Sequence, residues 1–174
     1  MVIGGLNEDG TPKVVEIDES KFFHRKYNVG HWRAGHWVFG RVERESGRCF
    51  LVEVPNRRRE TLEELIKRWI LPGTHIISDG WAAYAHIDEI DGGLYSHSFV
   101  VHQRNFVSPQ NSDVHTNSID NLWMRAKRKF RRQFGTSDSL FESYLHEFIW
   151  RNTIKDHKLV FGEFLKLIRL TYVM

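Results

Sequence analysis

The chain has 174 residues, of which 41% are hydrophobic, so it can bury one ordinary core and is expected to form a single domain over residues 1–174. Its net charge of +3 is modest, and its one cysteine, Cys49, excludes a disulfide framework and a multi-cysteine zinc site. No stretch approaches the roughly 18 apolar residues that span a bilayer, and residues 1–10 lack the features of a signal peptide. We therefore expect a soluble protein of a reducing compartment, without a membrane partner.

Three strands are expected first. Val14–Ser20 alternates between apolar and polar residues, which places Ile17 on one face of a strand and Asp18 on the other. His36–Arg44 and Cys49–Pro55 form a predicted hairpin around a Gly-containing turn. The first half of the chain therefore predicts three sequential antiparallel strands.

A helix and a parallel strand are expected next. Thr61 and Glu64 have the spacing of a capping box, and apolar residues recur at helical spacing until Pro72 and Gly73 stop the helix. His75–Ser78 has the character of a buried strand. Because a strand, helix and strand in this order favour a parallel crossover, the new strand should lie beside the first, with Asp79 at its carboxyl end.

The second half of the chain is expected to alternate again. Residues 81–90 predict a short helix, and residues 97–103 predict another strand. Residues 104–117 are rich in Pro, Asn, Ser and Asp, and we expect a mobile loop there. A helix from Ser118 through Arg132 follows, with Asn117 as its N-cap, which puts Asp120 at the third helical position. Two further helices, over 138–152 and 161–172, are expected to pack apolar residues in the core: Leu140, Phe141, Tyr144, Leu145, Phe148, Phe164, Leu165 and Ile168.

Three aspartates stand at the ends of apolar runs: Asp18, Asp79 and Asp120. Ligands bind outside the carboxyl ends of the strands in open α/β sheets, and neighbouring strands lie about 5 Å apart, so two of these carboxylates can reach one cation. Carboxylate oxygens suit Mg²⁺ or Mn²⁺ better than zinc or copper. Each aspartate taken alone has a structural explanation, since Asp commonly ends strands, begins turns and stabilises the first turn of a helix.

Two basic clusters suggest a polyanionic partner. The candidate contacts are Lys127, Arg128, Arg131 and Arg132 in the predicted helix, Arg57 and Arg58 before the first helix, and His115. A single basic run is more often a solvated helix face. Two such clusters beside a carboxylate site favour DNA or RNA.

Several separated motifs together resemble one family. They are IGG, VVEIDESKF, the RKY and HW segment, WVFG, TLEELI, IISDGW, HTNSIDNLW followed by KRKFRRQFGT, and FIWRN. The chain resembles Merlin-type DNA transposases and their bacterial insertion-sequence relatives from about residue 3 to 152. The resemblance implies a DDE-type catalytic domain with an α/β, ribonuclease H-like fold, in which helices flank a mixed five-stranded sheet.

The resemblance also implies a mechanism and partners. In two-metal phosphoryl transfer, Asp18 would bridge two Mg²⁺ or Mn²⁺ ions while Asp79 and Asp120 each hold one. DNA, as transposon ends and target, would be the substrate of a homo-oligomer. The protein would be nuclear in a eukaryote and cytoplasmic otherwise.

The sequence departs from the family pattern in two ways. The third acid is usually glutamate, and Asp120 is one methylene shorter, so we expect weakened activity. The amino-terminal segment that recognises DNA ends in family members is expected to be absent, because Asp18 lies so near Met1.

Two other functions remain open. One is a transposase-derived protein that binds nucleic acid without chemistry. The other is a cellular ribonuclease H-like nuclease, which would keep the metal site and change the substrate.

Overall fold

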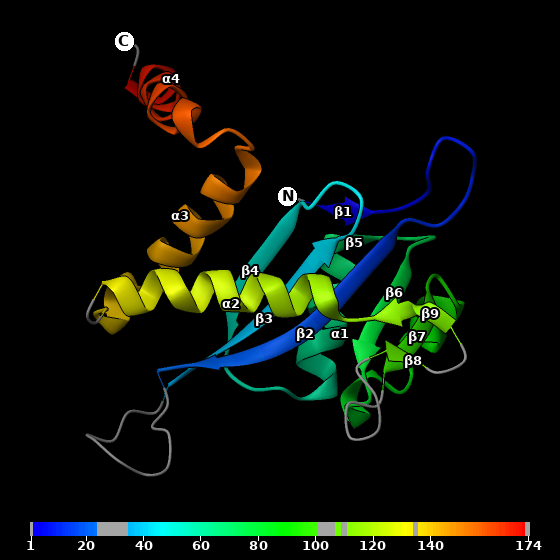
Figure 1. Ribbon diagram of the computed structural model, residues 1–174. Helices are drawn as coiled ribbons and strands as arrows, with labels where there is room; N and C mark the ends of the chain where they lie inside the picture. Colours follow the sequence, from blue (N-terminus) through cyan, green and yellow to red (C-terminus); the bar gives the residue numbers. More distant parts are fainter. Residues whose placement is uncertain (1, 24–34, 101–106, 109–110, 134–135, 173–174) are drawn as a thin grey trace.

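A central five-stranded sheet organises the computed structural model, which describes residues 2–23, 35–100, 107–108, 111–133 and 136–172 (Figure 1). Its strand order is β4-β3-β2-β6-β7, with β2 and β3 antiparallel, β3 and β4 antiparallel, and β6 and β7 both parallel to β2. The expected order of strands is confirmed. The bounds are β2 (Val14–Phe22), β3 (His36–Glu43), β4 (Cys49–Val54), β6 (His75–Asp79) and β7 (Ser96–Val100).

Helices cover both faces of this sheet (Figure 1). Alternate residues of β2 point to opposite faces, and each face carries apolar side chains that pack in a separate core cluster. Val15 and Ile17 pack on the side of α1 (Arg59–Trp69), in a cluster that also holds Leu62 and Ile66 of that helix. Phe22 packs on the other side, against α2 (Asn117–Arg132) and α3 (Phe141–Thr153). The same side of β2 carries Asp18, so the candidate acid lies beneath α2.

The first helix corrects one expectation. α1 begins at Arg59 with Arg58 as its N-cap, and that cap has no side-chain hydrogen bond. Thr61 is already inside the helix, where its hydroxyl donates to Asn56 Oδ1 at 2.9 Å, so the predicted capping box is wrong. Asn56 Oδ1 also accepts the backbone N–H of Arg58, and it organises this turn instead. The helix ends at Trp69, and β5 (Ile70–Leu71) then pairs in parallel with β1 (Ile3–Gly4).

The segments between β6 and α2 also differ from expectation. The predicted helix over 81–90 is two 3₁₀ turns, η1 (Ala82–Tyr84) and η2 (Ile87–Gly92). Within the expected loop, β8 (Val107–Ser108) and β9 (Asn111–His115) form an antiparallel pair, so this part is not free of regular structure. Its mobility stays a prediction. Residues 101–106, and the RKY motif within 24–34, lie outside the described residues.

The end of the chain holds the clearest failure of the expected packing. After η3 (Asp138–Leu140), α3 buries Phe141, Leu145 and Phe148 as expected. η4 (His157–Leu159) then leads into α4 (Val160–Tyr172), which extends away from the sheet and buries none of its residues (Figure 1). Core positions are therefore wrong for Leu140, Phe164, Leu165 and Ile168, which are 39% to 49% exposed. Apolar spacing predicts a helix, but it does not say whether a surface is available to cover it.

Across the described ranges, every helix is too short or too polar to cross a bilayer.

Candidate active site

Asp18 and Asp79 lie on neighbouring parallel strands. The register of β2 and β6 pairs Val14 with His75 and Glu16 with Ile77. Two more residues along each strand bring Asp18 level with Asp79, and residues level with each other in parallel strands point to the same face. Asp79 ends β6 as expected, whereas β2 continues from Asp18 to Phe22, so the expected position of Asp18 near a strand end is wrong. β2 therefore extends beyond the end of β6, and Asp18 and Asp79 lie level with each other at the point where β6 ends.

Asp120 approaches this pair from α2. The helix begins at Asn117 with Thr116 as N-cap, one residue earlier than expected, so Asp120 is its fourth residue. Its side chain is exposed, and the Thr116 hydroxyl donates to its Oδ2 at 3.3 Å. Asp120 is close enough to raise the pKa of Asp18, by less than Asp79 does. Within the described part of the chain, however, no three His, Cys, Asp or Glu side chains are grouped closely enough to hold one metal ion.

The environment of the carboxylate pair disfavours negative charge on Asp18. Burial, followed by repulsion from Asp79, raises the pKa of Asp18 from 3.8 to about 7, and the hydrogen bond from Trp123 only partly opposes this rise. Buried anions of this kind are normally paired or coordinate metals. Oxygen-only donors with excess negative charge are the set that Mg²⁺ or Mn²⁺ prefers, so the residues present fit such an ion.

A tryptophan that the sequence pattern assigns to the core contacts the first acid. Trp123 Nε1 donates to Asp18 Oδ2 at 2.8 Å. Gly40 is the β3 partner of Asp18, and a Cβ added at Gly40 would lie 2.5 Å from Cζ2 and Cη2 of the Trp123 indole. The absence of a side chain at Gly40 therefore creates the space that lets Trp123 reach Asp18. The only signal in the sequence was a tryptophan one helical turn after Asp120.

A second buried acid fixes the start of α2. Glu16 is fully buried, its Oε1 accepts from Arg44 Nε at 2.6 Å, and its Oε2 accepts the backbone N–H of Ile119 at 2.9 Å. The carboxylate thus satisfies a free N–H in the first turn of α2 and favours the helix dipole. Arg44 Nη2 also donates to the carbonyl oxygen of His115 at 2.6 Å. Together these contacts attach β9 and α2 to the sheet and set the distance between Asp120 and Asp18.

His115 therefore has a place in this anchor. Its Nδ1 accepts from Arg44 Nη2 at 3.1 Å and lies 3.5 Å from Glu16 Oε1. Sequence reasoning proposed His115 as a DNA contact and did not identify Glu16 or Arg44, because their pairing joins residues far apart in the chain. A DNA contact by His115 stays a prediction.

The opposite side of β2 carries another acid that the sequence analysis missed. Burial, followed by repulsion from Asp18 and Asp79, raises the pKa of Glu19 to about 8. Tyr84 of η1 donates its hydroxyl to Glu19 Oε1, and Arg57 Nη1 lies 4.0 Å from Glu19 Oε2. Carboxylates are thus crowded around Asp18 on both faces of the strand.

The predicted basic contacts lie in two places. Lys127 is partly buried on α2 with its Nζ 5.6 Å from the centre of the Phe22 ring, and Arg128, Arg131 and Arg132 are exposed toward the end of the helix. Arg58 is exposed at the start of α1, and Arg57 stacks on tryptophan rings next to Glu19. Basic side chains thus follow α2 beyond Asp120, and another borders the acids from the η1 side. DNA contacts by these residues stay predictions.

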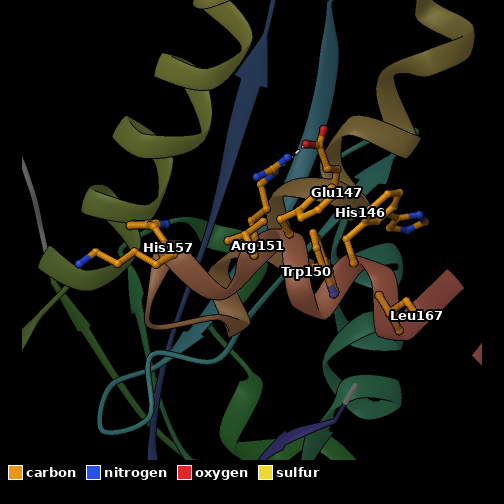
Figure 2. Close-up of a pocket in the computed structure, with 10 residues that line it drawn as sticks. His146, Glu147, Trp150, Arg151, His157 and Leu167 are labelled. Atoms are coloured by element: carbon orange, nitrogen blue, oxygen red, sulfur yellow. Dashed lines mark hydrogen bonds and ion pairs between the residues drawn. The ribbon is translucent and has the colours of Figure 1, made fainter. Parts of the chain in front are cut away.

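A pocket of about 750 Å³ lies elsewhere, between α3 and α4. Figure 2 shows His146 and Trp150 of α3 and Leu167 of α4 among the residues that line it. None of the predicted site residues contributes to this lining, so the candidate active site is separate from this pocket.

Two solved structures share the fold of this chain. The catalytic core domain of BIV integrase superposes with a TM-score of 0.54 at 14% identity, covering 79% of this chain and 80% of that one. A chain of the simian T-cell lymphotropic virus intasome, solved with PP2A regulatory subunit B56 gamma, gives a TM-score of 0.51 at 15% identity and covers 86% of this chain, which spans 50% of that one. At such identities the likeness concerns the fold alone, and together with the mixed sheet it confirms the predicted ribonuclease H-like fold.

Sequence relatives identify the family. A Haemophilus influenzae protein described as an uncharacterized transposase-like protein is 31% identical over 104 residues, which are 60% of this chain and 80% of that protein. The model of the ISXO2-like transposase domain matches residues 7–153, which include β2, β6 and α2 with all three aspartates. The chain therefore belongs to the family of ISXO2-like transposase domains.

Proposed function

We propose that this domain performs DDE-type DNA strand cleavage and strand transfer with Mg²⁺ or Mn²⁺. The observation that carries the proposal is the pair of Asp18 and Asp79 on adjacent strands, with the pKa of Asp18 raised to about 7 in a member of a transposase family. Two partly buried carboxylates that repel each other cost stability, and a bound cation would offset that repulsion.

Each residue has a proposed role. Asp18, Asp79 and Asp120 would hold the ions, which when bound supply activation of a water or 3′-hydroxyl nucleophile and stabilisation of the leaving oxygen. Trp123 keeps the Asp18 carboxylate in place, and Glu16 keeps α2 at its position on the sheet. Lys127, Arg128, Arg131 and Arg132 would bind DNA phosphates, which makes the affinity depend on salt and little on sequence.

The finer classification is also a proposal. The motifs quoted above favour a Merlin-type relative, acting as a homo-oligomer on paired transposon ends and a target. Such an enzyme works where its DNA is, in the nucleus of a eukaryote or the cytoplasm of a bacterium.

The direct test is nicking and strand transfer on supercoiled and oligonucleotide DNA with Mg²⁺ or Mn²⁺. Asp18→Asn and Asp79→Asn should abolish both reactions while circular dichroism shows a folded protein. Asp88→Asn, an exposed acid on η2, is the matched control and should keep activity. Equal activity in the wild type and the two site variants would remove the catalytic proposal.

One observation favours a second candidate, a transposase-derived DNA-binding protein without chemistry. The described residues include no group of three acidic ligands able to hold one metal ion, and the Asp120 side chain is exposed. If the short reach of Asp120 is the only defect, Asp120→Glu should raise cleavage by restoring one methylene. If the chain is a binder, the wild type and Asp120→Glu should both be inactive, and DNA binding should survive mutation of all three aspartates.

A further inference from the structure

Trp81 occupies a fixed position beside the proposed metal ligands. It follows Asp79 by two residues, and its backbone N–H donates to Asp79 Oδ1 at 3.0 Å. This short turn fixes the backbone of Trp81 next to the Asp79 carboxylate. Even so, the Trp81 side chain is not part of the core, since 42% of its surface is exposed.

A guanidinium group supports the exposed ring. The Cζ atom of Arg57 lies 4.7 Å from the centre of the Trp81 ring and 3.9 Å from the centre of the Trp37 ring, so Arg57 stacks on both indoles. Glu19 holds the same guanidinium from 4.0 Å, and Lys21 Nζ lies 5.5 Å from the centre of the Trp37 ring. The stack consists of Trp37, Arg57 and Trp81, and we call it the indole stack.

The indole stack has the composition of a surface for single-stranded nucleic acid. Every nucleobase has a π face that can stack on an aromatic ring, and positive charge beside the ring attracts the phosphate backbone. Core packing explains Trp37, which is partly buried against the α1 cluster, but it does not explain an indole that is 42% exposed. Water contact of a large aromatic ring is unfavourable, and a stacking base would relieve it.

We propose that Trp81 is a stacking platform for an unpaired nucleobase of the DNA strand that enters the candidate active site. The proposal rests on the proposed function, since it takes DNA as the substrate. The base next to the reacting phosphate would lie on the indole, and Arg57 would hold the indole in place. The site would then favour frayed or single-stranded ends over intact duplex, because a paired base cannot reach the ring.

The test is a thermodynamic cycle between protein and DNA. Fluorescence anisotropy would measure binding of an oligothymidylate of about 12 nucleotides and of an abasic oligonucleotide of equal length and charge, in EDTA to prevent cleavage. Trp81→Ala should weaken oligothymidylate binding about 5- to 150-fold, the range for loss of one stacked base. The same variant should leave abasic binding nearly unchanged, and Trp81→Phe should recover most of the loss.

Trp150→Ala is the matched control, because Trp150 lies on α3 beside the separate pocket. It should bind both oligonucleotides like the wild type. Equal losses on the two oligonucleotides in Trp81→Ala, or no loss on oligothymidylate, would overturn the stacking role, as would a wild type that binds neither. The result is independent of catalysis: Asp18→Asn and Asp79→Asn test the proposed chemistry, and stacking can fail while metal-dependent cleavage persists.

Discussion

Replacing Asp18 by Asn should stabilise the metal-free protein at high pH. The pKa of the Asp18 carboxyl is raised from 3.8 to about 7 in the folded protein, so the fold retains a proton that the unfolded chain has already released. Stability therefore falls as the pH rises from about 4 to about 7, and the full cost persists above that interval. A difference of about 3 in pKa corresponds to about 4 kcal/mol, an upper limit because Asp79 and Glu19 share the repulsion.

Asn keeps the shape of the side chain and can still accept the hydrogen bond from Trp123, so the substitution removes charge and little else. Each kcal/mol changes the melting temperature of a chain of this size by roughly 2 to 4 °C, so Asp18→Asn should melt several degrees higher at pH 8. At pH 5 only part of this cost has developed, so the advantage of Asp18→Asn should be much smaller there than at pH 8, and below about pH 4 the two proteins should melt together. Thermal unfolding, followed by circular dichroism in EDTA, measures the melting temperatures of both proteins at each pH.

Adding Mg²⁺ at pH 8 should stabilise the wild type more than Asp18→Asn, because the ion binds the folded carboxylates and the variant has lost one of them. Asp88→Asn controls for the loss of an exposed acid. The reasoning fails if Asp18→Asn is no more stable than the wild type at pH 8, or if its advantage is the same at pH 5. Either result would mean that the carboxylates are not crowded.

Three further substitutions test the packing around the site. Gly40→Ala places a Cβ against the Trp123 indole and should cost about 1 to 3 kcal/mol in urea unfolding while lowering cleavage; full stability would show that the indole has room. Trp123→Phe removes the N–H that donates to Asp18, and a hydrogen bond to a charged acceptor contributes about 1.5 to 3 kcal/mol to stability. Mg²⁺ binding, measured by calorimetry, should therefore weaken, and unchanged affinity would show that Trp123 does not position Asp18. Arg41 is fully buried against Phe50 and Trp69, and its guanidinium has no hydrogen-bond partner among the described residues. Arg41→Met should therefore raise stability by about 1 to 4 kcal/mol, and a loss would reveal a partner for the charge.

Local patterns were sufficient to predict much of the fold. The alternation in VVEIDES placed Ile17 in the core and Asp18 on the other face, and the strand-helix-strand order placed β6 beside β2. These features follow from burial of one face of each element, which makes apolar residues recur at the period of a strand or a helix. The same periodic patterns predicted that Asp79 ends a strand and that Asp120 lies in the first turn of a helix, as the structure has them.

Other features depended on how the elements pack together. The contacts of Trp123 with Asp18, and of Glu16 with Ile119, join residues more than a hundred positions apart, and no local pattern distinguishes these side chains from core or surface residues. α4 shows the converse, because its apolar spacing predicted burial and the fold leaves it exposed.

The sequence by itself thus determined the strands of the central sheet, the main helices and which acids are available. Only the tertiary structure decided that Asp18 and Asp79 lie level with each other, that Gly40 makes room for Trp123, and that the described residues include no group of three side chains able to hold one metal ion. The physical reason is that secondary structure depends on short-range burial and hydrogen bonding, whereas a site depends on the relative position of elements that are distant in the chain. Packing fixes those relative positions, and small differences in them decide whether three carboxylates can bind the same ion.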